Sequence, residues 1–156
     1  MGENEKGYPR RPPRLSRIFD QSPLYFVTFN TWQRRPLLAN DAVHESFRGY
    51  AIKNKERGFA VGRYVIMPDH IHLFCSPTSK DSVSITNWAS FWKRKVSLDF
   101  PDLNPIWQRD CWDTQLRAHE SYTEKWSYME RNPVRAGLVD HPDKWLFKGT
   151  INHLPW

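Results

Sequence analysis

The stretch Val65-Ile66-Met67-Pro68-Asp69-His70-Ile71-His72-Leu73-Phe74 decides how we expect this chain to fold. Side chains alternate between the two faces of a β-strand, so His70 and His72 project on one face. Ile71 and Leu73 project on the other face, into a core. The sequence therefore predicts two imidazoles side by side on a rigid strand. This arrangement suits a catalytic metal site that has one further ligand and an open position.

The same histidine pair also has a plain structural interpretation. Histidine is only intermediate in its tendency to be buried, and a histidine on a strand is commonly a hydrogen-bonded surface group. A His-hydrophobe-His pair directly after the turn-like Met67-Pro68-Asp69 is less common by chance. Spacing alone thus leaves both metal or phosphate chemistry and a structural role open.

The segments around this stretch predict one α+β domain. Strands are expected over 24–29, 59–66 and 70–75, with a short strand or extended entry over 106–109. Helices are expected from Asp41, as the cap, to about Arg57, from Ser82 or Ser84 to about Leu98, and from Glu120 to Asn132. Their apolar stripes consist of Val43, Phe47, Tyr50 and Ala51, then Trp88, Phe91 and Trp92, then Tyr122, Trp126 and Met129. This order is typical of one antiparallel sheet with helices packed against it.

Composition favours a polyanionic partner. The 156 residues carry Lys+Arg 23 against Asp+Glu 17, a formal net charge of +6, and the sequence pI is about 9.5. Nucleic acid is the simplest partner for such a chain. The 8 Trp, 6 Tyr and 9 Phe mostly belong to a core, but exposed aromatics among Lys and Arg can stack on unpaired bases.

The sequence also indicates compartment and domain organisation. No apolar run reaches the length of a membrane span, and the N-terminus lacks a hydrophobic signal segment. The cysteines, Cys75 and Cys111, fit a reducing cytosol, so we expect a cytoplasmic protein. Residues 1–17 read as a basic, flexible arm, and residues 18–156 as a single domain.

A second group of functional residues is expected on the last predicted helix. Tyr128 and Asn132 are four residues apart, so a phenol and an amide share one face, away from the apolar stripe. A surface tyrosine next to an asparagine that merely ends the helix before Pro133 is the structural alternative.

Four ordered segments resemble the single-tyrosine HUH transposases, most closely the REP-associated tyrosine transposases of bacteria. They are Tyr25-Phe26-Val27-Thr28-Phe29, Met67-Pro68-Asp69-His70-Ile71-His72-Leu73, Ile106-Trp107-Gln108-Arg109-Asp110 and Tyr128-Met129-Glu130-Arg131-Asn132-Pro133-Val134-Arg135-Ala136-Gly137-Leu138. The resemblance implies a ferredoxin-like sandwich and a transposase that cleaves and rejoins single-stranded DNA beside a hairpin.

The resemblance also implies roles for individual residues. His70 and His72 are the expected metal ligands, Asn132 is the third ligand, and Tyr128 is the nucleophile that forms a 5′-phosphotyrosine. The metal is expected to be Mg²⁺ or Mn²⁺. Two imidazoles shift the preference toward Mn²⁺-like ions, while an amide carbonyl, phosphate and water supply oxygens. Related transposases often have Gln at the position of Asn132, and Gln115 is a polar alternative ligand.

DNA contacts are expected from basic residues near these segments. The candidates for phosphate contacts are Arg34, Arg35, Lys93, Arg94, Lys95, Arg109, Arg131 and Arg135. Trp107 and Trp112 are candidates for stacking on a base, with core packing as the alternative for at least one of them. The oligomeric state stays open between a monomer and a homodimer.

Three other functions remain as alternatives. A DNA-binding protein descended from such a transposase would bind without cleaving. A zinc hydrolase would use His70 and His72 to activate water, but no motif supplies the carboxylate or third histidine that it usually needs. A plain structural domain would tolerate loss of both histidines without change in metal or DNA affinity.

Overall fold

The computed structural model describes residues 23–53, 55, 58–79, 83–116 and 119–154. In these ranges the strands are β1 (Leu24–Thr31), β2 (Phe59–Met67), β3 (His70–Pro77), β4 (Trp107–Leu116) and β5 (Lys148–Thr150), and the α-helices are α1 (Asp41–Lys53), α2 (Ile85–Asp99), α3 (His119–Glu130) and α4 (Asn132–Arg135). The predicted basic arm lies outside the described residues. Each helix within the described ranges is too short or too polar to cross a membrane.

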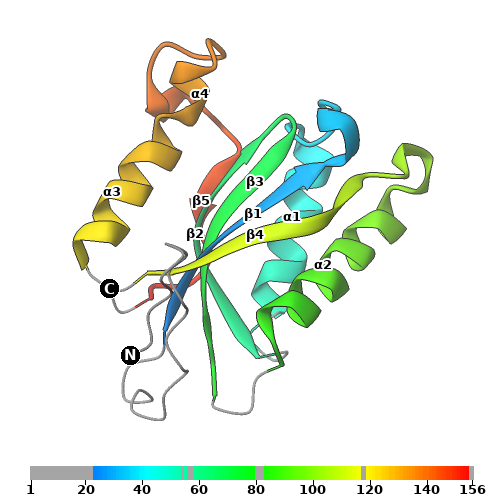
Figure 1. Ribbon diagram of the computed structural model, residues 1–156. Coiled ribbons are helices and arrows are strands. Elements are labelled where there is room, and N and C mark those ends of the chain that lie inside the picture. The colour runs from blue at the N-terminus through cyan, green and yellow to red at the C-terminus, as the bar shows by residue number, and fades with distance from the viewer. Residues whose placement is uncertain (1–22, 54, 56–57, 80–82, 117–118, 155–156) are drawn as a thin grey trace, which may run out of the picture.

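One antiparallel sheet with strand order β4-β1-β3-β2-β5 organises the molecule. Helix α1 connects β1 to β2, and β3 returns between those two strands. Helix α2 then leads to β4 on the other side of β1. Figure 1 shows α1 and α2 on one side of the sheet and α3 and α4 on the other. The predicted ferredoxin-like α+β sandwich is therefore confirmed, with β5 added beside β2.

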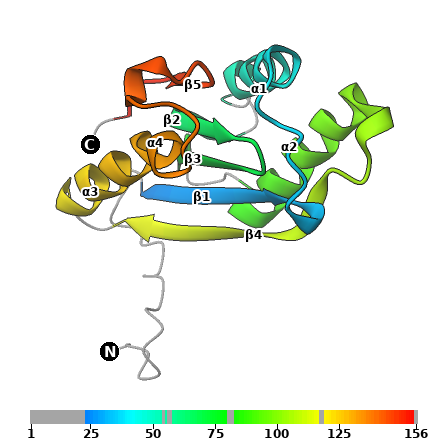
Figure 2. The ribbon, with the colours of Figure 1, turned by 90° about the horizontal axis from the view of Figure 1, so that it is seen from above.

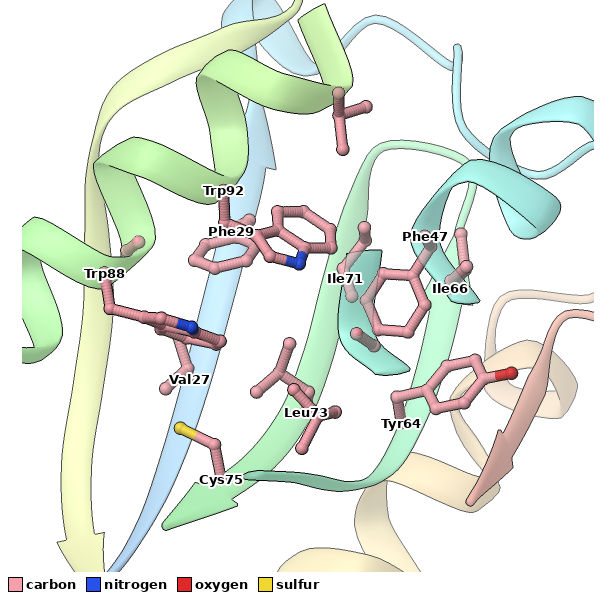
Figure 3. Close-up of a cluster of buried hydrophobic side chains, with 14 of the residues drawn as sticks. Val27, Phe29, Phe47, Tyr64, Ile66, Ile71, Leu73, Cys75, Trp88 and Trp92 are labelled. Carbon is pink, nitrogen blue, oxygen red and sulfur yellow. The ribbon is translucent and has the colours of Figure 1, made fainter. Parts of the chain in front are cut away.

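The larger core lies between the sheet and helices α1 and α2. Ile71 and Leu73 point into it, as strand alternation predicts, and both are buried. Figure 3 shows Trp88 and Trp92 from α2 beside Phe29 of β1. Ser84 caps α2 by accepting a hydrogen bond from the backbone N–H of Asn87, so the predicted start at Ser84 is confirmed.

A smaller core lies on the opposite face, under α3. Phe26, Phe74 and Met129 are buried there, and Tyr122 and Trp126 pack against them. The predicted apolar stripe of the last helix is thus confirmed. His70 and His72 share the face of Phe74 because residues two apart on a strand point the same way. The histidine pair therefore lies on the α3 side of the sheet.

Several element ends differ from the prediction. Asn40, rather than Asp41, caps α1, because its Oδ1 accepts from the backbone N–H of Val43. Within the described residues α1 ends at Lys53, and the predicted end at Arg57 lies outside them. Strand β4 is ten residues long, since pairing with β1 extends it to Leu116. Finally, α3 ends at Glu130, so the predicted helix through Asn132 is divided in two.

Candidate metal and nucleophile site

The two histidines lie side by side on β3, between β1 and β2. The centroids of the His70 and His72 rings are 4.6 Å apart, with the ring planes inclined at 71°. Thr28 of β1 and Val65 of β2 are the cross-strand partners of His72. The His72 ring also stacks on Phe26, with centroids 5.2 Å apart. Both side chains are partly accessible, so the paired and reachable imidazoles that the sequence predicts are present.

Hydrogen bonds at Nδ1 fix the orientation of both rings. His70 Nδ1 lies 2.8 Å from Asp69 Oδ1, and His72 Nδ1 lies 2.9 Å from Thr28 Oγ1. With the carboxylate as acceptor, His70 carries its proton on Nδ1 and presents an unprotonated Nε2. The Thr28 hydroxyl accepts in the same way if His72 has that tautomer. Such partners are typical of metal-binding histidines, whose second nitrogen holds the ring in place.

Both imidazoles are held neutral by their surroundings. Burial lowers the pKa of His72 to about 3, and the charges of His70, Lys125, Arg135 and Arg34 act in the same direction. Burial also lowers the pKa of His70, against the opposing hydrogen bond and charge of Asp69. Because a metal ligand must be unprotonated, neither ring has to lose a proton near pH 7 before it can bind a cation.

Asp69 is itself held by Arg34. Arg34 Nε donates to Asp69 Oδ2 at 2.9 Å, and its Nη1 donates to Asn30 Oδ1 at 3.2 Å. Burial opposes ionisation of Asp69, but the hydrogen bonds and charges of His70 and Arg34 outweigh it and lower its pKa. Gln33 and Arg34 have φ values of 55° and 54°, a left-handed conformation that costs energy outside glycine. This backbone strain lies at the residue that anchors the carboxylate.

Asn132 connects the histidine pair to the helices above it. Its Nδ2 lies 3.4 Å from His70 Nε2, while its Oδ1 accepts from Arg135 Nη2 at 3.0 Å. A half-turn of the amide exchanges the two atoms and points the carbonyl oxygen at the histidine. Asn132 therefore lies beside His70, where its amide can present either the nitrogen or the oxygen.

Tyr128 is joined to Asn132 through Arg135. The Arg135 guanidinium lies over the Tyr128 ring, with Cζ 3.8 Å from the ring centroid, and Nη2 also donates to the Tyr128 carbonyl at 2.7 Å. The Tyr128 side chain is 55% exposed, so a substrate can approach it. A continuous series of contacts thus runs from His70 through Asn132 and Arg135 to Tyr128.

The break between α3 and α4 falls inside this series. Tyr128 is in the last turn of α3, whereas Asn132 begins α4. Arg131, between the two helices, keeps a near-helical backbone, and its N–H bonds to the Ser127 carbonyl at 3.3 Å. The two residues therefore stay close although the single helix predicted for them is wrong.

The basic residues predicted to contact DNA are in different environments. Lys93 is buried, and its Nζ donates to the carbonyls of Gln108 and Arg109. Arg35 Nη1 donates to the carbonyls of Leu103 and Pro105. These placements suit structural roles better than phosphate contacts.

The remaining candidates divide between the two sides of the sheet. Arg94 and Lys95 belong to α2, on the face away from the histidines. Arg34 and Arg135 contact the site itself, and Arg109 and Arg131 are exposed. The structure therefore does not bring the predicted basic residues into one surface.

The donor set fits a divalent cation of the Mn²⁺ or Mg²⁺ type. Two imidazole nitrogens and one amide oxygen leave positions for phosphate and water oxygens. Gln115 is opposite Tyr25 on the other face of the sheet and cannot join this set. Among the described residues no group of three or more His, Cys, Asp or Glu side chains could hold a metal. The ligand set expected of a zinc hydrolase is thus absent from the described part of the chain.

Sequence reasoning missed the residues that hold the histidines. Thr28 and Asp69 were not among the predicted site residues, although both bind a histidine Nδ1. Asp69 directly precedes His70, and Thr28 lies in the first strand that the family motifs include. An antiparallel pairing of 24–29 with 70–75 would have pointed to Thr28, but the sequence alone does not fix that register.

Fold and site together define a class of protein: a ferredoxin-like domain with a His-x-His pair on its central strand and a tyrosine on a helix that covers that face.

No family model matches the sequence. Over 135 residues the chain is 27% identical to the REP-associated tyrosine transposase of Escherichia coli K12, which covers 84% of this chain and 78% of the relative. A Haemophilus influenzae protein, named provisionally as a member of the same family, is 25% identical over 143 residues, 84% of this chain and 81% of the relative.

Solved structures show the same fold. A REP-associated tyrosine transposase bound to a REP hairpin superposes with a TM-score of 0.68 at 23% identity, covering 87% of this chain and 81% of that one. A Deinococcus radiodurans protein, named provisionally as a transposase, gives a TM-score of 0.53 at 16% identity, covering 76% of this chain and 97% of that one. In sequence and in fold the chain is similar to the REP-associated tyrosine transposases, which confirms the resemblance predicted from its motifs.

Proposed function

We propose that this protein is a DNA strand-transfer enzyme that cleaves and rejoins single-stranded DNA next to a hairpin, with Tyr128 as its nucleophile. The observation that carries the proposal is the series of contacts from His70 through Asn132 and Arg135 to Tyr128. It connects a candidate cation site to an exposed phenol within one chain. The transposase names of the relatives and the hairpin bound to the structural neighbour support a DNA substrate.

In the proposed reaction, the Tyr128 hydroxyl gives its proton to solvent, its oxygen forms a bond to phosphorus and the bond from phosphorus to the 3′ oxygen breaks, and the 3′ oxygen takes a proton from solvent. The products are a 5′-phosphotyrosine and a free 3′-hydroxyl, so the energy of the phosphodiester is conserved for rejoining. A 3′-hydroxyl that attacks the phosphotyrosine reverses the step and releases the phenol. Arg135 lies on the ring and holds the tyrosine backbone, so it positions the nucleophile.

The proposed cation ligands are Nε2 of His70, Nε2 of His72 and Oδ1 of Asn132. When bound there, Mg²⁺ or Mn²⁺ neutralises a non-bridging phosphate oxygen and makes phosphorus more open to attack. Asn132 presents its oxygen after the amide half-turn, and the Arg135 guanidinium then gives up its bond to Oδ1 while keeping its bond to the Tyr128 carbonyl. Asp69 and Thr28 bond to Nδ1 of the two rings, which leaves Nε2 of each ring available as the ligand atom.

Phosphate contacts are proposed for the basic residues that contact the site or are exposed outside α2. These are Arg34, Arg109, Arg131 and Arg135. Arg35 and Lys93 are left out because their cationic groups bond to backbone carbonyls, and Arg94 and Lys95 because α2 lies on the far side of the sheet. Tyr128 contacts Arg135 of its own chain, and we propose that the attack is in cis. A cytoplasmic location is proposed together with this DNA substrate.

A covalent-adduct assay tests the proposal. Wild-type protein is incubated with Mn²⁺ and a labelled hairpin that carries a single-stranded flank, and the products are separated on a denaturing gel. A protein-linked label is expected from wild type. Tyr128→Phe should reduce it by at least about 1,000-fold, because the nucleophilic oxygen is absent.

Tyr122→Phe is the matched control, because it removes a phenol from the same helix that packs on the smaller core. It should form the adduct at close to the wild-type level. An adduct that persists in Tyr128→Phe contradicts the proposed nucleophile. Hairpin binding by wild type without adduct in Mn²⁺ or Mg²⁺ establishes the alternative, a binding protein descended from a transposase.

A further inference from the structure

Trp112 is an exposed indole on the strand at the edge of the sheet. Its exposed fraction is 68%, whereas Trp88 and Trp92 are 1% exposed. Figure 2 shows β4, the strand that bears Trp112, at the outer edge beyond β1. Exposure of single apolar residues is common, so the indole becomes informative only through its position.

The strand register places Trp112 on the face of the histidine pair. Trp112 is directly opposite Thr28 on β1, and Thr28 is directly opposite His72 on β3. Directly opposed residues of antiparallel strands have their side chains on one face, and Thr28 Oγ1 indeed meets His72 Nδ1. Since neighbouring strands are about 4.8 Å apart, Trp112 and His72 are separated by roughly 10 Å across the sheet.

Positive charge lies near the histidine end of this row. Lys125 Nζ lies 5.0 Å from the centroid of the Phe26 ring, which itself stacks on His72. Arg34 bonds to Asp69 next to His70, and Arg135 bonds to Asn132, whose amide lies 3.4 Å from His70. A DNA strand whose phosphates contact these basic side chains as it passes His72 can place a neighbouring base over the sheet next to β4.

We propose that Trp112 is a stacking platform for an unpaired DNA base close to the cleaved phosphodiester. The inference rests on the proposed function for its substrate, single-stranded DNA. An indole face suits any base, because every base has a π-face, so Trp112 would recognise an unpaired base and not a particular sequence. A base inside a duplex is already stacked on both sides and cannot use this platform.

Equilibrium binding of hairpin DNA tests the platform. Affinity is measured in EDTA, to prevent cleavage, for a hairpin with a single-stranded flank and for the same hairpin without the flank. Trp112→Ala should weaken binding of the flanked hairpin about 5- to 150-fold, the range for loss of one base-aromatic stack. Trp112→Phe should recover most of the affinity, whereas Trp112→Leu should not. Binding of the unflanked hairpin should be unchanged.

Abasic sites placed along the flank locate the stacked base. At one position an abasic site should weaken wild-type binding but leave Trp112→Ala unaffected, because the contact is already lost. Leu98→Ala, an exposed apolar residue on α2, is the control for a general surface effect. Thermal unfolding should be the same for all variants, since the replaced side chains are exposed.

Two results overturn the inference: equal affinity of Trp112→Ala and wild type for the flanked hairpin, or an equal loss with and without the flank. Failure of the inference is distinguishable from failure of the proposed function. If wild type forms no adduct but Trp112→Ala loses affinity only for flanked DNA, cleavage is disproved and the platform stands. If the adduct forms and affinity is unchanged, only the platform is disproved.

Discussion

On the face covered by α1 and α2, the sheet buries Phe29 with Trp88 and Trp92 in one aromatic cluster. On the opposite face the same strands bury Phe26 and Phe74 but leave His70 and His72 partly accessible. Alternation along a strand makes this division possible, since each second residue serves the other face. A large dry core on one side can therefore hold the central strand rigid while its other side carries polar groups in a fixed geometry.

The comparison predicts that stability and chemistry respond to substitutions on different faces. Trp92→Ala should lower the free energy of unfolding by about 3–5 kcal/mol, because it empties a buried aromatic site. Among the described residues the Trp92 indole N–H has no hydrogen-bond partner. Trp92→Phe keeps an aromatic ring and removes this unsatisfied donor, so it should lower the free energy of unfolding much less than Trp92→Ala. Urea denaturation measures both.

Trp112→Ala is the matched control for this prediction, since it removes the same side chain from an exposed position on the other face. It should change the free energy of unfolding by no more than about 0.5 kcal/mol. Similar losses of unfolding free energy for Trp92→Ala and Trp112→Ala would contradict the inference that the face under α1 and α2 provides most of the stability.

The second prediction concerns the carboxylate behind His70. Asp69→Asn should weaken Mn²⁺ binding about 10- to 100-fold, because the amide neither carries the charge that orients the imidazole nor fixes its tautomer. Titration calorimetry with Mn²⁺ measures the change. Arg34 also loses the charged acceptor of its hydrogen bond, so Asp69→Asn should lower the free energy of unfolding slightly.

Asp143→Asn provides the control, because Asp143 also neighbours a histidine, His141, at an exposed site away from the sheet. It should leave Mn²⁺ affinity unchanged. Equal affinity of Asp69→Asn and wild type would show that the carboxylate does not support a metal ligand.

The division between the faces also explains what the sequence could predict. The core face and the position of His70 and His72 follow from alternation in a strongly apolar strand, and both were predicted. Strand β4 was predicted too short, since polar and apolar residues after 110 are present in equal number and do not alternate with a clear period.

The details of the site depended on contacts that local patterns do not encode. Thr28 reaches His72 across 44 residues of sequence, and Arg135 in α4 lies over the ring of Tyr128 in α3, a contact between two separate helices. Lys93 was predicted on a basic surface but is buried, since α2 directs it toward β4, where two carbonyls accept from it. Charge counts alone cannot distinguish such a lysine from one in solvent.

A further expected effect is a dependence of stability on pH that comes from the histidine face. The pKa of His72 is about 3 in the folded protein, against about 6.5 for an unperturbed histidine in the unfolded chain. Between these values the unfolded state binds the extra proton, so stability is fully present above about pH 6.5 and falls as the pH decreases toward 3. The slope from this residue is at most about 1.4 kcal/mol per pH unit.

Urea denaturation from pH 7 to pH 4 should give a shallower decline in the free energy of unfolding for His72→Gln than for wild type. His153→Gln, at an exposed position, should match wild type. Parallel declines for wild type and His72→Gln would mean that His72 is not held neutral by the fold, and the preformed, unprotonated ligand pair would lose its physical basis.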